Sequence, residues 1–126
     1  MEKPKQTDKK DLMLREIEYL LEPSEHTVLS SRGILNNLVE GYLVLTDRKL
    51  CFYFKSNINI DKKFIATYPY LAKVSLSEGL LFSSLTITNA KNQSFSIGKI
   101  NKEKARKFYE ALTNIIKINQ KTQAPN

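Results

Sequence analysis

The sequence predicts a mainly β protein with some α structure: a seven-stranded antiparallel barrel or sandwich, capped by a C-terminal amphipathic helix and preceded by a short N-terminal helix. Three observations predict this architecture. Residues 27–97 contain short apolar or alternating segments separated by brief turns, a pattern typical of antiparallel strands. Apolar residues recur at helical spacing on either side of this region. The 126 residues suffice for one domain with its own core.

The N-terminal helix is predicted over residues 9–22, after a polar segment, residues 1–8, that we expect to be disordered. Asp8 can cap this helix. Pro23 ends it, because proline cannot continue the helical hydrogen bonds and restricts the residue before it. The apolar stripe of the helix consists of Met13, Ile17, Leu20 and Leu21.

The barrel is predicted over residues 27–98. Gly33 is a candidate for a β-bulge, polar residues 57–63 are expected to form a loop, and Pro69 ends the fourth strand or marks an edge. The turns are too short for helical crossovers, so the sheet is expected to be antiparallel. The strands are expected at residues 28–35, 42–45, 50–54, 64–68, 73–77, 85–88 and 94–97.

Residues 41–54, GYLVLTDRKLCFYF, are predicted to form a hairpin whose turn is the polar segment 46–49. Both faces of this hairpin are apolar, whereas a sheet with one wet side alternates apolar and polar residues. One face is therefore expected to fill the core. The other face is expected to meet a helix or another chain.

The C-terminal helix is predicted over residues 102–118, with Asn101 as its cap and a disordered tail over residues 119–126. Its wide apolar stripe is expected to close one end of the barrel. The stripe consists of Ala105, Phe108, Tyr109, Leu112, Ile115 and Ile116.

The formal net charge of +7 is spread over tails, loops and a helix, without a dense basic block. Solvated surfaces explain this distribution better than a nucleic-acid site does, because the aromatic residues lie at strand positions that are expected to be buried. The single cysteine, Cys51, is expected to be a small packed residue. With no apolar segment long enough to span a membrane, a cytoplasmic location is expected.

Four stretches, taken in order, resemble the bacterial PH-like domains of the YokE-like group, within the pleckstrin-homology superfold. The resemblance runs from about residue 12 to residue 116 and implies a non-catalytic domain that binds lipid head groups, peptides or other proteins. Lipid-binding members carry bases around the first strand connection. The matching stretch here, residues 36–40, has an acid and no base. The four stretches are residues 20–25 (LLEPSE), 41–50 (GYLVLTDRKL), 68–70 with Val74 (YPY), and 78–82 with 85–87 (EGLLF, LTI).

Two candidate binding surfaces follow. Lys55, Lys62, Lys63 and Lys91 are expected in loops at the open rim, where each base near an anionic membrane contributes about 1 kcal/mol. Four such bases would give only weak attachment, so a solvated rim is the favoured interpretation.

Leu80, Leu81 and Phe82 form the other candidate, a partner patch if they project from the loop after Gly79. The alternative, which we favour slightly, is that Leu80 and Phe82 continue a strand into the core.

Three tyrosines, Tyr42, Tyr53 and Tyr70, form a further face that either serves a peptide or packs beneath the N-terminal helix.

Catalysis has little support in the sequence. His26 is the only histidine and is expected to be an exposed loop residue. No phosphate-binding loop, catalytic triad spacing or set of metal ligands can be assembled, so no cofactor, metal or catalytic residue is expected.

The sequence therefore predicts a non-enzymatic PH-like binding or assembly module that acts through contacts with an unknown protein or with itself. Peripheral binding to anionic lipid through the basic rim is the alternative. The acidic first helix and the basic last helix are expected to attract one another, within one chain or between two.

Overall fold

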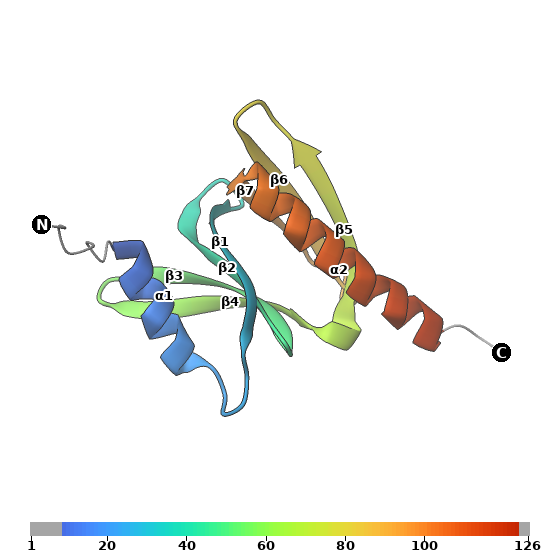
Figure 1. Ribbon diagram of the computed structural model, residues 1–126, viewed down its shortest axis with the longest axis horizontal. Helices are drawn as coiled ribbons and strands as arrows, with labels where there is room; N and C mark the ends of the chain where they lie inside the picture. The colour runs from blue at the N-terminus through green and yellow to red at the C-terminus, as the bar shows by residue number, and fades with distance from the viewer. Residues whose placement is uncertain (1–8, 124–126) are drawn as a thin grey trace, which may run out of the picture.

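The computed structural model describes residues 9–123 and consists of one seven-stranded antiparallel sheet with a helix on each face (Figure 1). This confirms the predicted strand number and the two helices. The tail predicted at residues 1–8 and the last three residues of the tail predicted at residues 119–126 lie outside the described residues, whereas residues 119–123 are helical. The elements are α1 (Lys9–Leu20), β1 (Thr27–Leu35), β2 (Val39–Thr46), β3 (Lys49–Ser56), β4 (Asn59–Thr67), a short 3-10 helix η1 (Tyr68–Tyr70), β5 (Leu71–Glu78), β6 (Phe82–Asn89), β7 (Ser94–Asn101) and α2 (Lys102–Gln123).

The sheet curls without closing into a barrel. Its strand order is β4-β3-β2-β1-β7-β6-β5, so β4 and β5 are its two edges although they are almost consecutive in the chain. Side chains of β6 and α2 bind the backbone on either side of the gap between these edges. The amide nitrogen of Asn89 donates to the carbonyl of Ile65 at 2.9 Å, and that of Asn119 donates to the carbonyls of Tyr68 and Leu71 at 2.7 and 3.0 Å.

The larger core lies between the sheet and α2. The predicted stripe of α2 is buried at Ala105, Phe108, Leu112 and Ile116, and it packs against apolar residues from β1 to β7. Asn101 caps the helix as predicted, with its side-chain oxygen accepting a hydrogen bond from the amide of Lys104 at 3.1 Å. The helix therefore forms one wall of the core.

A second, smaller core lies on the opposite face of the sheet, beneath α1. Ile17 packs there against the outward side chains of the β2–β3 hairpin, which are Tyr42, Val44, Cys51 and Tyr53. The alternate residues Leu43, Leu45, Leu50 and Phe52 belong to the core under α2. The prediction that one face of this hairpin fills the core and the other meets a helix is confirmed.

Four predicted boundaries or features are wrong. α1 ends at Leu20, two residues before its predicted end. α2 continues to Gln123, beyond its predicted end at residue 118, because Asn119 anchors its last turns to η1 and β5. The expected loop at residues 57–63 is a short turn. β4 begins at Asn59, because Asn57, with φ of 58°, reverses the chain at once.

Gly33 is also not a bulge, since it pairs regularly with Gly41; the register shift in β1 falls between Thr27 and Leu29. A Cβ atom on Gly33 would lie 2.6 Å from Cγ2 of Ile97. Glycine at this position therefore allows β1 to pass close to β7.

Candidate functional site

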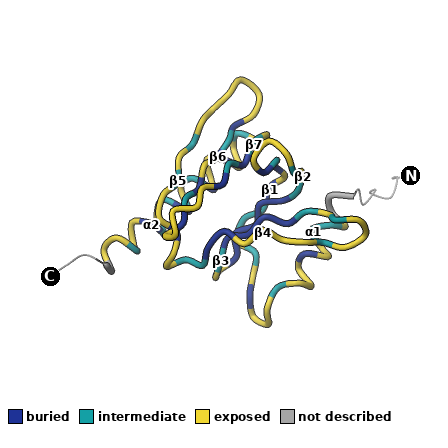
Figure 2. Tube along the Cα trace, turned by 180° about the vertical axis from the view of Figure 1, so that it is seen from behind, coloured by how far each residue is buried: buried dark blue, intermediate teal, exposed yellow. Residues whose placement is uncertain are grey.

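The β5–β6 hairpin projects from the body of the protein as an arm, and its turn is exposed (Figures 1 and 2). The amide of Gly79 donates to the carbonyl of Phe82 at 2.9 Å and closes a tight turn. Leu80, Leu81 and Phe82, which we call the arm tip, are 92, 77 and 47% exposed. The slight preference for burying Leu80 and Phe82 in the core is wrong. Leu80 lies in the turn, and Phe82 is half exposed although it begins β6 and pairs with Asn101.

Two contacts hold the outer part of the arm against the protein. The guanidinium Nε of Arg106, on α2, donates to the carboxylate of Glu78 at 2.5 Å. The ammonium group of Lys99, on β7, lies 5.7 Å from the ring centre of Phe82, a cation–π distance. The hydrogen bond from Arg106 lowers the pKa of Glu78, and the same bond raises the pKa of Arg106. The arm tip is thus presented on a braced hairpin.

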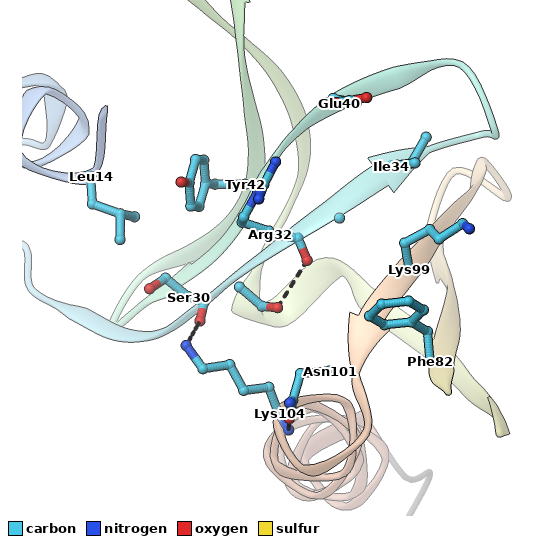
Figure 3. A pocket seen from close by; sticks show the side chains of 12 residues that line it. Leu14, Ser30, Arg32, Ile34, Glu40, Tyr42, Phe82, Lys99, Asn101 and Lys104 are labelled. Carbon is cyan, nitrogen blue, oxygen red and sulfur yellow. Dashed lines mark hydrogen bonds between the residues drawn. The ribbon is translucent and has the colours of Figure 1, made fainter. Parts of the chain in front are cut away.

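A groove of about 660 Å³ begins beside the arm tip, where β1 and β7 separate (Figure 3). These two strands pair only at Ile34–Gly98 and Leu35–Ile97. Beyond this point the groove runs between β1, the end of β7 and the first turn of α2, with α1 at its far end. The residues on its walls include Leu14, Arg32, Glu40, Phe82, Lys99 and Lys104.

The floor of the groove carries backbone carbonyls of β1. The ammonium group of Lys104 donates to the carbonyl of Ser30 at 3.1 Å, and the hydroxyl of Ser31 donates to the carbonyl of Arg32 at 2.9 Å, as the dashed lines in Figure 3 show. No pattern in the sequence predicted this groove. Its residues come from five separate segments that carry no shared motif.

The structure does not bring the four predicted rim lysines together. Lys62 and Lys63 lie on β4 rather than in a loop, and their pairing with Tyr53 and Phe52 places them on opposite faces of the sheet. Lys55, on β3, shares the face of Lys62, since it lies two residues from Tyr53.

Lys91 lies in the β6–β7 turn at the other end of β4, where the amide of its neighbour Ala90 donates to the carbonyl of Tyr70 in η1 at 2.8 Å. The four lysines therefore do not line one rim.

The three tyrosines also do not share a face. Tyr42 and Tyr53 are buried beneath α1, whereas Tyr70 lies on η1 and is 58% exposed. Burial raises the pKa of Tyr53 far above its usual range, as do the nearby Cys51 and Glu25. Tyr42 and Tyr53 therefore belong to the second core.

Glu25 connects two of the stretches that carry the family resemblance. Its buried carboxylate accepts hydrogen bonds from the hydroxyl of Thr46 at 2.6 Å, the amide of Glu22 at 2.9 Å and the ammonium group of Lys49 at 3.1 Å. Thr46 also accepts hydrogen bonds from the amides of Arg48 and Lys49, both at 3.1 Å. The polar turn 46–49 is thus bound to the α1–β1 connection, which gives its residues a structural role.

The only histidine and the only cysteine lie in different environments. His26 is exposed, as expected, and its backbone, rather than its ring, bonds to Asp47. Cys51 is buried, and burial raises the pKa of its thiol, which disfavours the reactive thiolate. Within residues 9–123 no group of three or more His, Cys, Asp or Glu side chains is placed to hold a metal ion. No helix in the same range has the length and apolar character to cross a membrane.

Comparison with solved structures identifies similar folds. The structure titled "The pleckstrin homology (PH) domain of USP37" superposes with a TM-score of 0.57 at 18% identity, covering 71% of this chain and 98% of that one. A C-terminal domain of an unknown protein from Leishmania infantum superposes with a TM-score of 0.60 at 16% identity, covering 86% and 98%. These matches confirm the PH-like fold. No curated protein matches the chain.

The sequence itself matches a family model described as "Bacterial PH domain" over residues 21–114. The match extends from the end of α1 to α2 and includes the whole sheet. The finer resemblance to the YokE-like group stays a prediction. The chain belongs to the bacterial PH domain family.

Proposed function

We propose that this chain is a non-enzymatic binding module that contacts a protein partner through the arm tip. PH-like folds are generally binding domains, but a fold alone does not specify a function. The observation that carries the proposal is the exposure of three consecutive large apolar side chains at the end of a braced hairpin. Exposed apolar patches are typical of interaction sites.

Burial of the arm tip against a protein partner would lower the free energy of the complex. Burying a large apolar side chain that is otherwise exposed contributes about 1.5–3 kcal/mol. Leu80 and Leu81 are both more than three-quarters exposed, so their burial in a partner's pocket would contribute most to binding. Such a small number of dominant residues is common in protein interfaces.

The test is an affinity capture from the native cell with the full chain, after chemical cross-linking, comparing the wild type with a Leu80→Ser/Leu81→Ser variant. The matched control is Leu38→Ser/Ile58→Ser, which removes two comparably exposed apolar residues from other turns. We expect at least one protein to be captured by the wild type and the control and lost with the tip variant. Equal capture by all three proteins would contradict the proposal.

A second copy of the chain is one form that the protein partner can take. The expected attraction between an acidic first helix and a basic last helix is weakened, because α1 carries three bases and three acids. α1 and α2 lie on opposite faces of the sheet, so any attraction between them would act between chains. Sedimentation velocity across a range of concentrations tests this form. A strictly monomeric chain would exclude self-association and leave a different protein as the partner.

Binding to anionic lipid is the alternative function, and the separation of the four rim lysines weakens it. Flotation with phosphatidylglycerol-containing and neutral vesicles at low salt tests it directly. Equal flotation with the two kinds of vesicle would rule out recognition of anionic lipid by Lys55, Lys62, Lys63 and Lys91.

A further inference from the structure

We propose that the groove between β1 and β7 binds an extended, acidic segment of a protein partner. This inference rests on the proposed protein-binding function and adds to it the chemical character of the partner and a second contact surface. The groove and the arm tip are continuous, because Phe82 belongs to both.

The backbone of β1 supports an extended ligand. Alternate residues of a strand direct their backbone groups toward the same neighbour. Ile34 pairs with Gly98 of β7. Ser30 and Arg32 lie four and two residues before Ile34, so they direct their backbone groups to the same side, but β7 does not pair with them there. The carbonyls of Ser30 and Arg32 instead accept side-chain hydrogen bonds from Lys104 and Ser31. The middle of the sheet thus presents a stretch that resembles an edge strand, which extended peptides recognise by strand addition.

The charge of the groove supports an acidic ligand. The groove is lined by three bases, Arg32, Lys99 and Lys104, and one acid, Glu40. All four side chains belong to exposed residues that a ligand can reach. A segment that carries carboxylates would pair with these bases, and a basic segment would be repelled by them. The charge complementarity therefore favours an acidic partner.

The groove also offers apolar contacts to a ligand. Leu14, Ile34 and Phe82 lie on the walls of the groove. Successive side chains of an extended segment point to opposite faces. Arg32 and Ile34 are two residues apart on β1 and therefore lie on one face of the sheet, together with Glu40, which pairs with Ile34. A segment that carries acidic and apolar residues on the same face could therefore contact Arg32 and Ile34 together. The volume of about 660 Å³ is within the range of pockets that bind small ligands or short peptides, about 300–1,000 Å³.

A membrane surface fits this groove less well than a peptide does. A bilayer would meet the convex arm tip, but the carbonyls of Ser30 and Arg32 lie on the floor of a concavity. Glu40 and Glu78 would also face an anionic surface unfavourably. Anionic vesicles therefore form the competing arm of the experiment.

The experiment is the selection of a phage-displayed library of random heptapeptides on the full chain. We expect the selected peptides to be enriched in Asp and Glu together with apolar residues. Binding should fall at least about tenfold in an Arg32→Glu/Lys99→Glu variant, which corresponds to about 1.4 kcal/mol. It should be unchanged in a Lys73→Glu/Lys91→Glu control, which reverses two exposed charges outside the groove. NMR should show the largest amide shifts at Ser30 to Gly33.

Three results would overturn the inference: no selected peptide above the bare support, selected peptides without acidic enrichment, or equal binding to the groove variant and the wild type. If anionic vesicles bind the wild type and no peptide is selected, the ligand is a membrane surface and the inference of a protein segment fails. If the captured protein is lost with the Leu80→Ser/Leu81→Ser variant but retained by the groove variant, the proposed function stands and the groove inference fails. Circular dichroism confirms that each variant is folded.

Discussion

Glu25 is the residue with the most consequential local environment. Its side chain is inaccessible to solvent, and Lys49, its ionic partner at 3.1 Å, is only 12% exposed. Charges removed from water need both a counter-charge and additional hydrogen bonds, and here Thr46 and the amide of Glu22 supply these bonds. Glu25 therefore joins the α1–β1 connection to the β2–β3 turn.

Replacing Glu25 by alanine is expected to destabilise the protein by about 3–5 kcal/mol, because Lys49 would remain buried without a partner. The matched control is Glu22→Ala, which removes the salt bridge to Arg48, where both side chains are substantially exposed. That loss should cost less than about 1 kcal/mol. Urea unfolding followed by circular dichroism measures the free energy of unfolding of both variants. Similar losses for the two variants would contradict the assigned role of Glu25.

The stability of the protein is expected to fall in acid partly through Glu25. Burial raises the pKa of this carboxyl. The hydrogen bonds from Thr46 and from the amide of Glu22, together with Lys49, lower the pKa by more than burial raises it, so the pKa lies below its ordinary value of 4.5. The folded state is thus stabilised above about pH 4.5, and this contribution disappears as the pH falls through the lowered pKa. Urea unfolding from pH 6 to pH 3 should show a shallower decline for Glu25→Gln than for the wild type. Parallel curves would exclude the contribution.

At the scale of elements, α2 is a structural wall of the larger core. Leu112 is fully buried in the middle of its apolar stripe, whereas Ile118, one and a half turns later, is 63% exposed. The apolar period predicted this helix well. Its end was harder to predict, because the last turns are held by hydrogen bonds from Asn119 to distant backbone.

Leu112→Ala is expected to cost about 2–5 kcal/mol of unfolding free energy, through lost burial and a cavity. Ile118→Ala, the control on the same helix, should change stability by no more than about 0.5 kcal/mol, the usual value for a surface substitution. Chemical denaturation measures both. A small loss for Leu112→Ala would show that α2 is not docked on the sheet.

For the whole molecule, the β2–β3 hairpin separates two cores. Leu43 and Leu45 face α2, while Tyr42 and Val44 face α1. We expect the effects of Leu112→Ala and Ile17→Ala to add within about 0.5 kcal/mol in the double variant, since the two side chains share no core. Denaturation of the two single variants and the double variant tests this. A larger deviation from additivity would mean that the two cores are coupled through the sheet.

The prediction of the fold from sequence succeeded where side-chain periodicity carries the information. The two-sided hairpin and the stripe of α2 are periodic patterns, and burial confirms both. β4 was predicted to start late because its first half is polar and charged. As an edge strand at the border of the sheet, it can carry Asp61, Lys62 and Lys63 without burying them.

The candidate sites were less predictable. Leu80 and Leu81 could be singled out as an apolar pair after a glycine, but local sequence does not distinguish the end of a strand from a projecting turn. The tight turn closed by Gly79 and Phe82 settles their exposure. The groove is less predictable still, because it depends on where β1 and β7 part.

By itself, the sequence determined the strand-rich architecture, the two amphipathic helices and the membership of the bacterial PH domain family, because these depend on local period and on ordered motifs along the chain. Only the tertiary structure decided that the rim lysines lie apart, that the arm tip is exposed, and that Arg32, Lys99 and Lys104 line one groove. These features depend on strand register and on the divergence of two strands about 60 residues apart in sequence. Such long-range geometry leaves no periodic signal in the residues that it brings together.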